Sequence, residues 1–220
     1  MKKLLSLWAL LALLLPLASQ AQETLTVANG TATNEYVPVY GYYLDDFCRA
    51  QFIYPASMLG SISGATITDL TFYVSQAPED AWSSTIAVKF SEVTDSVFGS
   101  AAFFNTASEA DAYIGTLTVS AGTMAIALDE PYTYSGGNLL VEFYSVTDGN
   151  YSRAYFYGIN RSNASVSGYN SSGISSISSP TRRSFLPKVT FTYTAGTLDM
   201  CYRPKALAAS DTTSSGFTLS

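Results

Sequence analysis

The stretch Ser135-Gly-Gly-Asn-Leu-Leu-Val-Glu-Phe-Tyr144 decides the fold class of this chain. Its first four residues are a turn sequence, because glycine and asparagine tolerate the positive φ angles at which a chain reverses. Apolar residues then recur at every second position, as Leu139, Val141 and Phe143. Successive side chains of a strand point to opposite faces, so this period of two predicts a half-buried strand.

The same alternation recurs along the chain and identifies further strands. Its members are Leu70, Phe72 and Val74; Ile86, Val88 and Phe90; Met124, Ile126 and Leu128; and Val189, Phe191 and Tyr193. Asp148-Gly149-Asn150 is a second turn sequence, and we expect both turns to reverse the chain between antiparallel strands. Strands without intervening helices predict an all-β fold, an antiparallel two-sheet β-sandwich of the jelly-roll-like kind, over residues 22–194.

Two segments interrupt this pattern. Thr106 to Tyr113 suits either one short helix or a loop, since Ser108, Glu109 and Asp111 are residues that a first helical turn favours. Ser162 to Pro180 is rich in serine, glycine and asparagine, and we expect an exposed loop with one short strand near Val166.

The amino-terminal residues 1–21 have the features of a secretory signal peptide. Lys2 and Lys3 precede an apolar run from Leu4 to Leu17, and Ser19-Gln20-Ala21 is a small-x-small cleavage site. The run is shorter than the roughly 20 apolar residues that a membrane span needs. We therefore expect a protein exported to the cell surface or secreted, without a membrane span.

The carboxy-terminal residues divide into a linker, 195–200, and a segment, 201–220. In that segment Pro204, an apolar residue, a turn rich in serine and threonine, and the alternating Phe217 and Leu219 resemble the first two strands of a fibronectin type III domain. The core tryptophan that usually follows these strands in that family is absent. The resemblance implies a short, incomplete β module and further domains in the same chain.

The domain before the linker resembles a secreted β-sandwich domain of surface proteins from anaerobic Gram-negative bacteria. The stretches that carry the resemblance are Thr33–Tyr43, Gln51–Ala56, Thr66–Tyr73, Pro131–Val141 and Phe185–Tyr193. That family has no established catalytic residues. The resemblance therefore implies a non-catalytic adhesin-like module, followed by fibronectin type III repeats.

Composition excludes several functions. Only 13% of the residues are charged, the formal charge is −6 and the isoelectric point is near 4.5, whereas nucleic-acid binding needs a basic stripe. The chain contains no histidine, so a Ser-His-Asp triad cannot form. Arg182, Arg183 and Lys188 are the one basic cluster, suited either to an acidic sugar or partner carboxylate or simply to a solvated strand.

Carboxylates leave two minor hypotheses. The adjacent pairs Asp45-Asp46, Glu79-Asp80 and Asp129-Glu130 are typical of solvated loops, although a glycosidase with two carboxylates remains a remote alternative. Asp45, Asp46 and Asp148 are candidate ligands for a structural calcium ion. The indication is weak, because the sequence has no Asp-x-Asp-x-Asp calcium loop. No other cofactor is expected.

Aromatic residues give the strongest indication of binding. The chain has 16 tyrosines, and tyrosine and tryptophan offer a flat apolar face with a polar tip that suits sugars and protein partners. The candidates are Tyr42, Trp82, Tyr151, Tyr155 and Tyr157, of which the last three would share one face of a strand. The alternative is that these rings fill the core or brace neighbouring strands.

Cys48 and Cys201 are the two cysteines. In an oxidising compartment they either form a disulfide that ties the sandwich to the following segment or remain independent thiols. The sequence thus favours a non-catalytic extracellular module of a bacterial surface protein that binds a glycan or a host or other extracellular protein. A structural spacer that presents a downstream domain is the alternative.

Overall fold

The computed structural model describes residues 21–196. The predicted signal peptide apart from Ala21, most of the predicted linker, and the fibronectin-like segment lie outside the described residues. Within them, no helix is long and apolar enough to cross a membrane.

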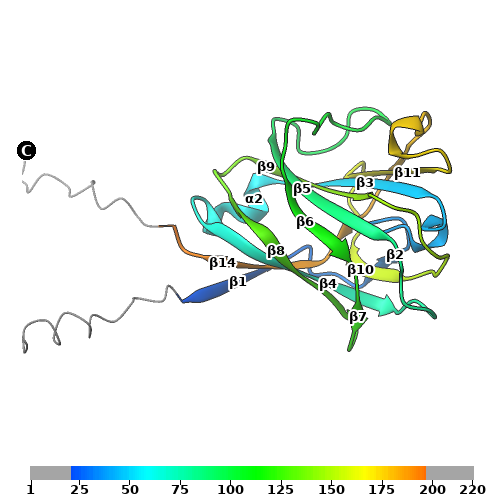
Figure 1. Cartoon of the computed structure of the whole chain (residues 1–220). Coiled ribbons are helices and arrows are strands. Elements are labelled where there is room, and N and C mark those ends of the chain that lie inside the picture. The colour runs from blue at the N-terminus through cyan, green and yellow to red at the C-terminus, as the bar shows by residue number, and fades with distance from the viewer. Residues whose placement is uncertain (1–20, 197–220) are drawn as a thin grey trace, which may run out of the picture.

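The described residues form two antiparallel sheets, which confirms the predicted all-β, two-sheet class (Figure 1). The eight-stranded first sheet consists of β1 (Gln22–Val27), β2 (Ala32–Asn34), β4 (Thr66–Gln76), β7 (Val119–Ser120), β8 (Thr123–Thr133), β10 (Tyr155–Ile159), β13 (Leu186–Pro187) and β14 (Val189–Thr194). The six-stranded second sheet has the order β12 (Thr181–Arg183), β11 (Ser165–Asn170), β3 (Phe47–Tyr54), β9 (Asn138–Ser145), β5 (Thr85–Val93) and β6 (Asp111–Thr116).

Aromatic side chains from both sheets meet in the core between them. Phe72 of β4 packs edge to face against Phe52 of β3 and Phe143 of β9, with ring centroids 6.0 and 5.5 Å apart. Tyr54 of β3 contacts Phe191 of β14 in the same way at 5.4 Å. Phe72, Phe143 and Phe191 are inward positions that the period of two predicted, whereas Phe52 and Tyr54 lie on β3, which the alternation did not identify.

The two predicted turns do not join paired strands. Ser135 to Asn138 leads from β8 in the first sheet to β9 in the second, and Asp148 to Asn150 leads from β9 back to β10 in the first. The expectation that they reverse the chain between antiparallel neighbours is therefore wrong. Positive φ at Gly136, 117°, serves a crossing between layers.

β9 is buried on both faces, whereas the sequence predicted a half-buried strand. Leu140 on its outer face is fully buried and packs in a small apolar cluster with Ile53, Phe98 and Val166. Phe98 belongs to the long connection 94–110 between β5 and β6, which lies over the outer face of the second sheet. The connection 94–110 therefore buries the outer face of β9, which the alternating sequence of that strand did not predict.

The two ambiguous segments are now assigned. No helix forms over Thr106 to Tyr113, and its last residues begin β6. The short helices lie elsewhere: η2 (Gly41–Tyr43), α2 (Ala56–Leu59), η3 (Gly60–Ile62) and η4 (Ile174–Ser176). The strand expected near Val166 is β11, which has six residues, and four of them are buried. It lies between β3 and β12 rather than in an exposed loop.

Candidate functional site

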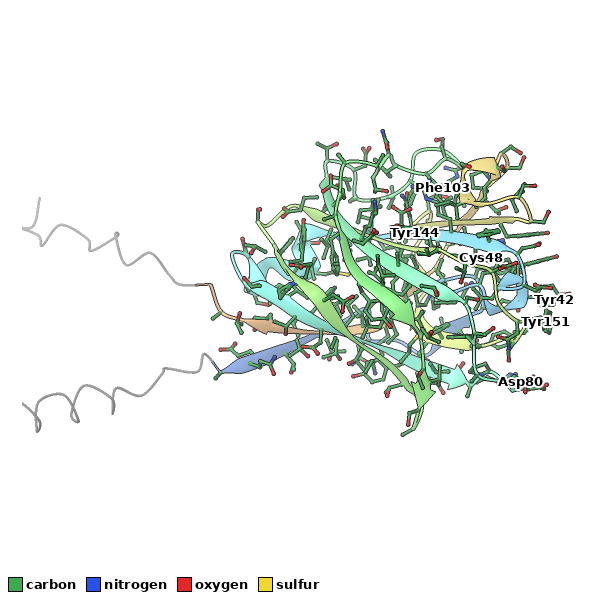
Figure 2. The ribbon with its side chains drawn as sticks, viewed as in Figure 1. Tyr42, Cys48, Asp80, Phe103, Tyr144 and Tyr151 are labelled. Carbon is green, nitrogen blue, oxygen red and sulfur yellow. The ribbon has the colours of Figure 1, made fainter. Side chains whose placement is uncertain are left out.

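Six tyrosines gather at one end of the sandwich, and we call this surface the tyrosine end. Its members are Tyr36, Tyr40, Tyr42, Tyr43, Tyr151 and Tyr169. The first four come from the connection between β2 and β3, Tyr151 from the connection before β10, and Tyr169 from β11. Figure 2 shows Tyr42 and Tyr151 at the end of the molecule opposite the first and last described residues.

The rings form one contiguous network. Tyr40 lies at its centre, with the centroids of Tyr36 and Tyr43 at 4.9 and 5.2 Å. Tyr43 and Tyr169 are stacked almost parallel, 3.5 Å apart with an interplanar angle of 9°. Tyr42 meets Tyr151 edge to face at 4.8 Å. Three segments that are distant in the sequence therefore build a single aromatic surface.

Trp82, a binding candidate from the sequence, is buried beneath this surface. Its side chain is 3% exposed, and its indole nitrogen donates a hydrogen bond to the carbonyl of Ser152 at 2.6 Å. The backbone N–H of Ser152 in turn donates to the carbonyl of Gly41 at 3.1 Å. A Cβ on Gly41 would lie 3.1 Å from the indole nitrogen and would overlap the Ser152 carbonyl, so glycine is required there.

The outer rings remain accessible to a ligand. Tyr151 is 49% exposed and Tyr169 is 40% exposed, whereas Tyr36, Tyr40 and Tyr42 are half-buried. Among the described residues only two other large apolar side chains reach such exposure, Ile114 and Val146. An exposed aromatic pair on one surface is thus a distinctive feature of this molecule.

Two arginines stack on the rings. The Arg153 guanidinium lies 4.5 Å from the centroid of Tyr42, and that of Arg183 lies 3.6 Å from the centroid of Tyr36. Both distances are within the range of cation–π attraction. Arg153 is also 3.0 Å from a carboxylate oxygen of Glu35. The tyrosine end therefore combines aromatic faces with fixed cationic groups.

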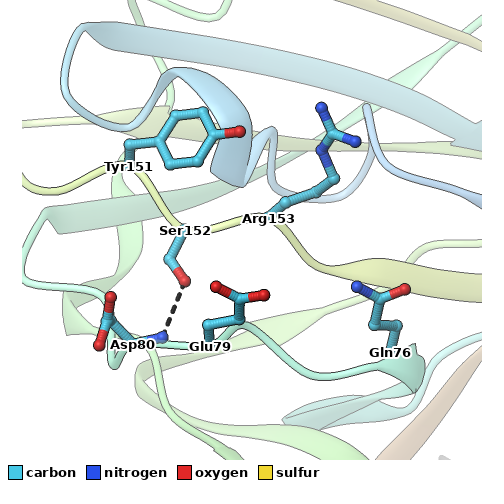
Figure 3. Close-up of a pocket in the computed structure, with 6 residues that line it drawn as sticks. All are labelled: Gln76, Glu79, Asp80, Tyr151, Ser152 and Arg153. Carbon is cyan, nitrogen blue, oxygen red and sulfur yellow. Dashed lines mark hydrogen bonds between the residues drawn. The ribbon is translucent and has the colours of Figure 1, made fainter.

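Two polar pockets flank the tyrosine end. The Tyr151 pocket, of about 250 Å³, is lined by Gln76, Glu79, Asp80, Tyr151, Ser152 and Arg153 (Figure 3). The Tyr169 pocket, of about 330 Å³, is lined by Tyr40, Tyr43, Tyr169, Arg183, Asn170, Ser167, Gly168, Ser178, Ser179 and Thr181. Each pocket has one exposed tyrosine of the network in its wall.

Burial and mutual contact keep two of these tyrosines protonated. A hydrogen bond with Tyr169, together with burial, raises the pKa of Tyr43 to about 12. Burial and the neighbouring Tyr36 and Glu35 raise the pKa of Tyr40, while Arg183 acts in the opposite direction. At neutral pH these two hydroxyls are therefore uncharged and act as hydrogen-bond donors and acceptors.

The structure separates the other predicted tyrosines. Tyr155 and Tyr157 lie on one face of β10, but Tyr151 precedes the strand, so the predicted stripe of three is wrong. Tyr155 is linked to the site because Arg153 donates a hydrogen bond to its hydroxyl at 3.3 Å. Tyr157 has no aromatic contact among residues 21–196 and does not join the tyrosine end.

Two groups at this site were not singled out from the sequence. Tyr169 lies within the serine-rich segment that was expected to be mostly a loop, and the one available signal was its closeness to the short strand predicted near Val166. Arg153 carries no signal of its own, because its stacking on Tyr42 joins segments more than a hundred residues apart.

The three acidic pairs lie on different parts of the fold: Asp45-Asp46 precedes β3, Glu79-Asp80 follows β4, and Asp129-Glu130 belongs to β8. Glu79 and Asp80 are the two carboxylates of the Tyr151 pocket and come from neighbouring positions of one loop (Figure 3), whereas glycosidases place two carboxyls across a cleft. Gly149 donates a hydrogen bond to the Leu44 carbonyl at 2.7 Å, so the loops of Asp45 and Asp148 are adjacent. Within residues 21–196, however, no three acidic, histidine or cysteine side chains are grouped to hold a metal.

Cys48 is buried behind the tyrosine end. Its thiol donates a hydrogen bond to the Tyr43 carbonyl at 2.8 Å, and burial raises its pKa. The thiolate is the reactive form, so this environment makes the thiol unreactive. Cys201 lies outside the described residues, so the choice between a disulfide and two independent thiols is untested.

The comparisons with known proteins match neither a family model nor a curated protein to this chain.

Proposed function

We propose that this protein is a non-catalytic extracellular module that binds a glycan or an extracellular protein through the tyrosine end. The observation that carries the proposal is the contiguous tyrosine network with two exposed rings, Tyr151 and Tyr169, beside two polar pockets. The features typical of a secretory signal peptide support the extracellular setting.

The physical basis is the amphipathic character of tyrosine. Its ring presents an apolar face to the C–H groups of a sugar or to a partner side chain, and its hydroxyl pairs with polar groups. Its two side-chain torsions lose little conformational entropy on binding. Here stacking orders the rings before any ligand arrives, since Tyr43 holds Tyr169 and Tyr42 holds Tyr151. Such preorganisation reduces the cost of binding.

The position of the site also suits a binding module. β1 and β14 pair along their whole length, with Gln22 opposite Thr194, so the first and last described residues lie together. The tyrosine end lies at the opposite side of the sandwich (Figures 1 and 2). The chain on either side of the described residues therefore attaches away from the proposed binding surface.

The test is to screen the exported protein against a glycan array and in pull-downs from extracellular protein mixtures. Tyr151→Ala and Tyr169→Ala should each weaken binding by about tenfold or more, the loss expected when an anchoring aromatic is removed. Tyr157→Ala is the matched control, because that tyrosine is half-buried on β10 outside the network, and it should bind as the wild type does.

The spacer alternative makes the opposite prediction. A spacer would show no specific ligand, and Tyr151→Ala and Tyr169→Ala would alter stability alone. A ligand whose binding is equally weakened by Tyr157→Ala would also contradict the proposed site.

A further inference from the structure

The two pockets at the tyrosine end differ in charge. The wall of the Tyr151 pocket has the carboxylates of Glu79 and Asp80 beside Arg153. The wall of the Tyr169 pocket has Arg183 and no carboxylate. Of the two pockets, only the Tyr169 pocket therefore has an arginine in its wall without a carboxylate beside it.

Arg183 is held in place but is not neutralised. Its guanidinium is stacked on the ring of Tyr36 at 3.6 Å, and its Nε donates a hydrogen bond to the hydroxyl of Ser167 at 3.3 Å. It forms no ion pair within residues 21–196. Arg153 differs in this respect, since a Glu35 oxygen lies 3.0 Å from its Nε.

A guanidinium fixed in this way presents its terminal N–H groups in one plane. That geometry matches the two oxygens of a carboxylate, and such bidentate pairs combine strength with directional selectivity. Because two contacts already order the Arg183 side chain, little conformational entropy remains to be lost on binding. Arg183 is therefore preorganised to pair with a carboxylate.

The rest of the wall fits the remainder of a sugar. Hydroxyl groups line it at Ser178, Ser179 and Thr181, whereas the Asn170 amide, also in the wall, is bonded to the backbone of Ser172 and Ser176. Tyr43 stacks on one face of the Tyr169 ring and Tyr40 contacts it edge-on at 6.0 Å, and the Tyr169 side chain is still 40% exposed, so part of the ring is accessible to a ligand. The volume of about 330 Å³ lies within the range of small-molecule sites.

We propose that the Tyr169 pocket binds an acidic sugar unit, with Arg183 pairing with the carboxylate and Tyr169 stacking on the ring. This inference rests on the proposed function in its glycan-binding form. It goes further by assigning one pocket, one chemical class of ligand and one residue that selects the acid.

The experiment compares two sugars that differ only in the acid. Glucuronic acid and glucose are titrated separately into the exported protein, and chemical-shift changes give the two dissociation constants. The wild type should prefer glucuronic acid by about tenfold or more. Arg183→Gln should reduce this preference to nearly none, because it should weaken the binding of glucuronic acid far more than that of glucose.

Arg182→Gln is the matched control. Arg182 is the neighbouring residue on β12, and its guanidinium donates to the carbonyls of Phe98 and Gly99 rather than lining the pocket. Arg182→Gln removes the same charge as Arg183→Gln, so any effect of net charge alone appears in both variants. The preference should persist in Arg182→Gln. Should Arg183→Gln fail to fold, Tyr169→Ala provides the second variant and should weaken the binding of both sugars.

The possible results separate this inference from the proposed function. Equal affinity for the two sugars, lost in Tyr169→Ala, would overturn the acid selection and leave a glycan-binding tyrosine end. Sodium acetate that binds as tightly as glucuronic acid would overturn the sugar assignment, since a plain anion site would explain it. Binding of a protein ligand alone, lost in Tyr151→Ala, would overturn the inference and leave the protein-binding form of the proposed function.

Discussion

Glu142 is a carboxylate in an environment that ordinarily excludes charge. It is 2% exposed at the centre of the second sheet, where Arg49, Gln51 and Thr106 all donate hydrogen bonds to it. Gln51 also bonds in both directions with the backbone of Phe104, at 2.8 and 3.0 Å. This network fastens the connection 94–110 to the outer face of β9 and β3.

Removing that carboxylate should be costly. Glu142→Ala leaves the partly buried Arg49 and the buried Gln51 and Thr106 without their shared acceptor, and breaking such a pair costs about 3–5 kcal/mol. We expect this loss in the free energy of unfolding measured by urea denaturation. Glu130→Ala, which removes an equal charge from an exposed position, should change stability by at most about 0.5 kcal/mol. Similar losses of unfolding free energy in both variants would show that the hydrogen-bond network adds nothing beyond the effect of removing one negative charge.

The sequence was least informative about which individual residues belong to the site. Tryptophan and tyrosine have both an apolar body and a polar tip, so the same residue type suits a core and a binding surface. Tyr42 and Tyr151 belong to the tyrosine end, whereas Trp82, selected for the same reason, is buried. Composition alone does not distinguish these cases, because burial depends on segments that are distant in the chain.

At the scale of elements, periodicity predicted the strands but not their partners. β4, β5, β8, β9 and β14 all include segments identified from alternation. Alternation is a property of one strand and the two faces it presents. Pairing depends on which strands the crossings between layers bring together, as with β9, whose neighbours β3 and β5 precede it by about fifty residues or more.

The tight hairpin between β7 and β8 has a turn that the sequence did not reveal. Val119 pairs with Met124 and Ser120 with Thr123, so Ala121 and Gly122 form a two-residue turn. Both have positive φ, 50° and 78°, which is the pattern of a type I′ turn. Alanine is not a residue that signals such a turn, since its Cβ disfavours the left-handed region by about 1–2 kcal/mol.

Relieving this strain should stabilise the protein. Ala121→Asn places a residue that tolerates positive φ at the first position of the turn, where Asn-Gly is the preferred pair. We expect the free energy of unfolding to rise by up to about 1 kcal/mol, measured as an increase in the thermal midpoint. Ala125→Asn, at an exposed position of β8 in the same hairpin, should give no gain, because asparagine is disfavoured in strands. An equal shift of the thermal midpoint in both variants would show that relief of strain in the turn is not the cause of the stabilisation.

At the scale of the whole molecule, the core between the sheets contains tyrosine as well as aliphatic and phenylalanine side chains. Tyr54 is fully buried, and its hydroxyl donates a hydrogen bond to the Pro187 carbonyl at 2.8 Å, which joins β3 in one sheet to β13 in the other. Burial raises its pKa well above the usual value of 10.0. Burial, with a contribution from Glu92, raises the pKa of Tyr132 to about 12.

These raised pKa values predict a loss of stability in alkali. Above pH about 10, tyrosines of the unfolded chain release protons that the folded chain retains. The stabilisation is therefore complete below pH about 10 and declines as pH rises toward 12 and beyond. Urea denaturation between pH 8 and 12 should show the free energy of unfolding falling over the upper half of this range.

Tyr54→Phe isolates the contribution of the buried hydroxyl. At pH 8 the variant should be less stable by about 1–2 kcal/mol, because the Pro187 carbonyl loses its donor. Between pH 10 and 12 its stability should fall less steeply than that of the wild type, since one proton fewer distinguishes the folded from the unfolded state. Parallel curves over that interval would mean that Tyr54 does not retain its proton when the chain is folded. The stability deficit would then come from the hydrogen bond alone.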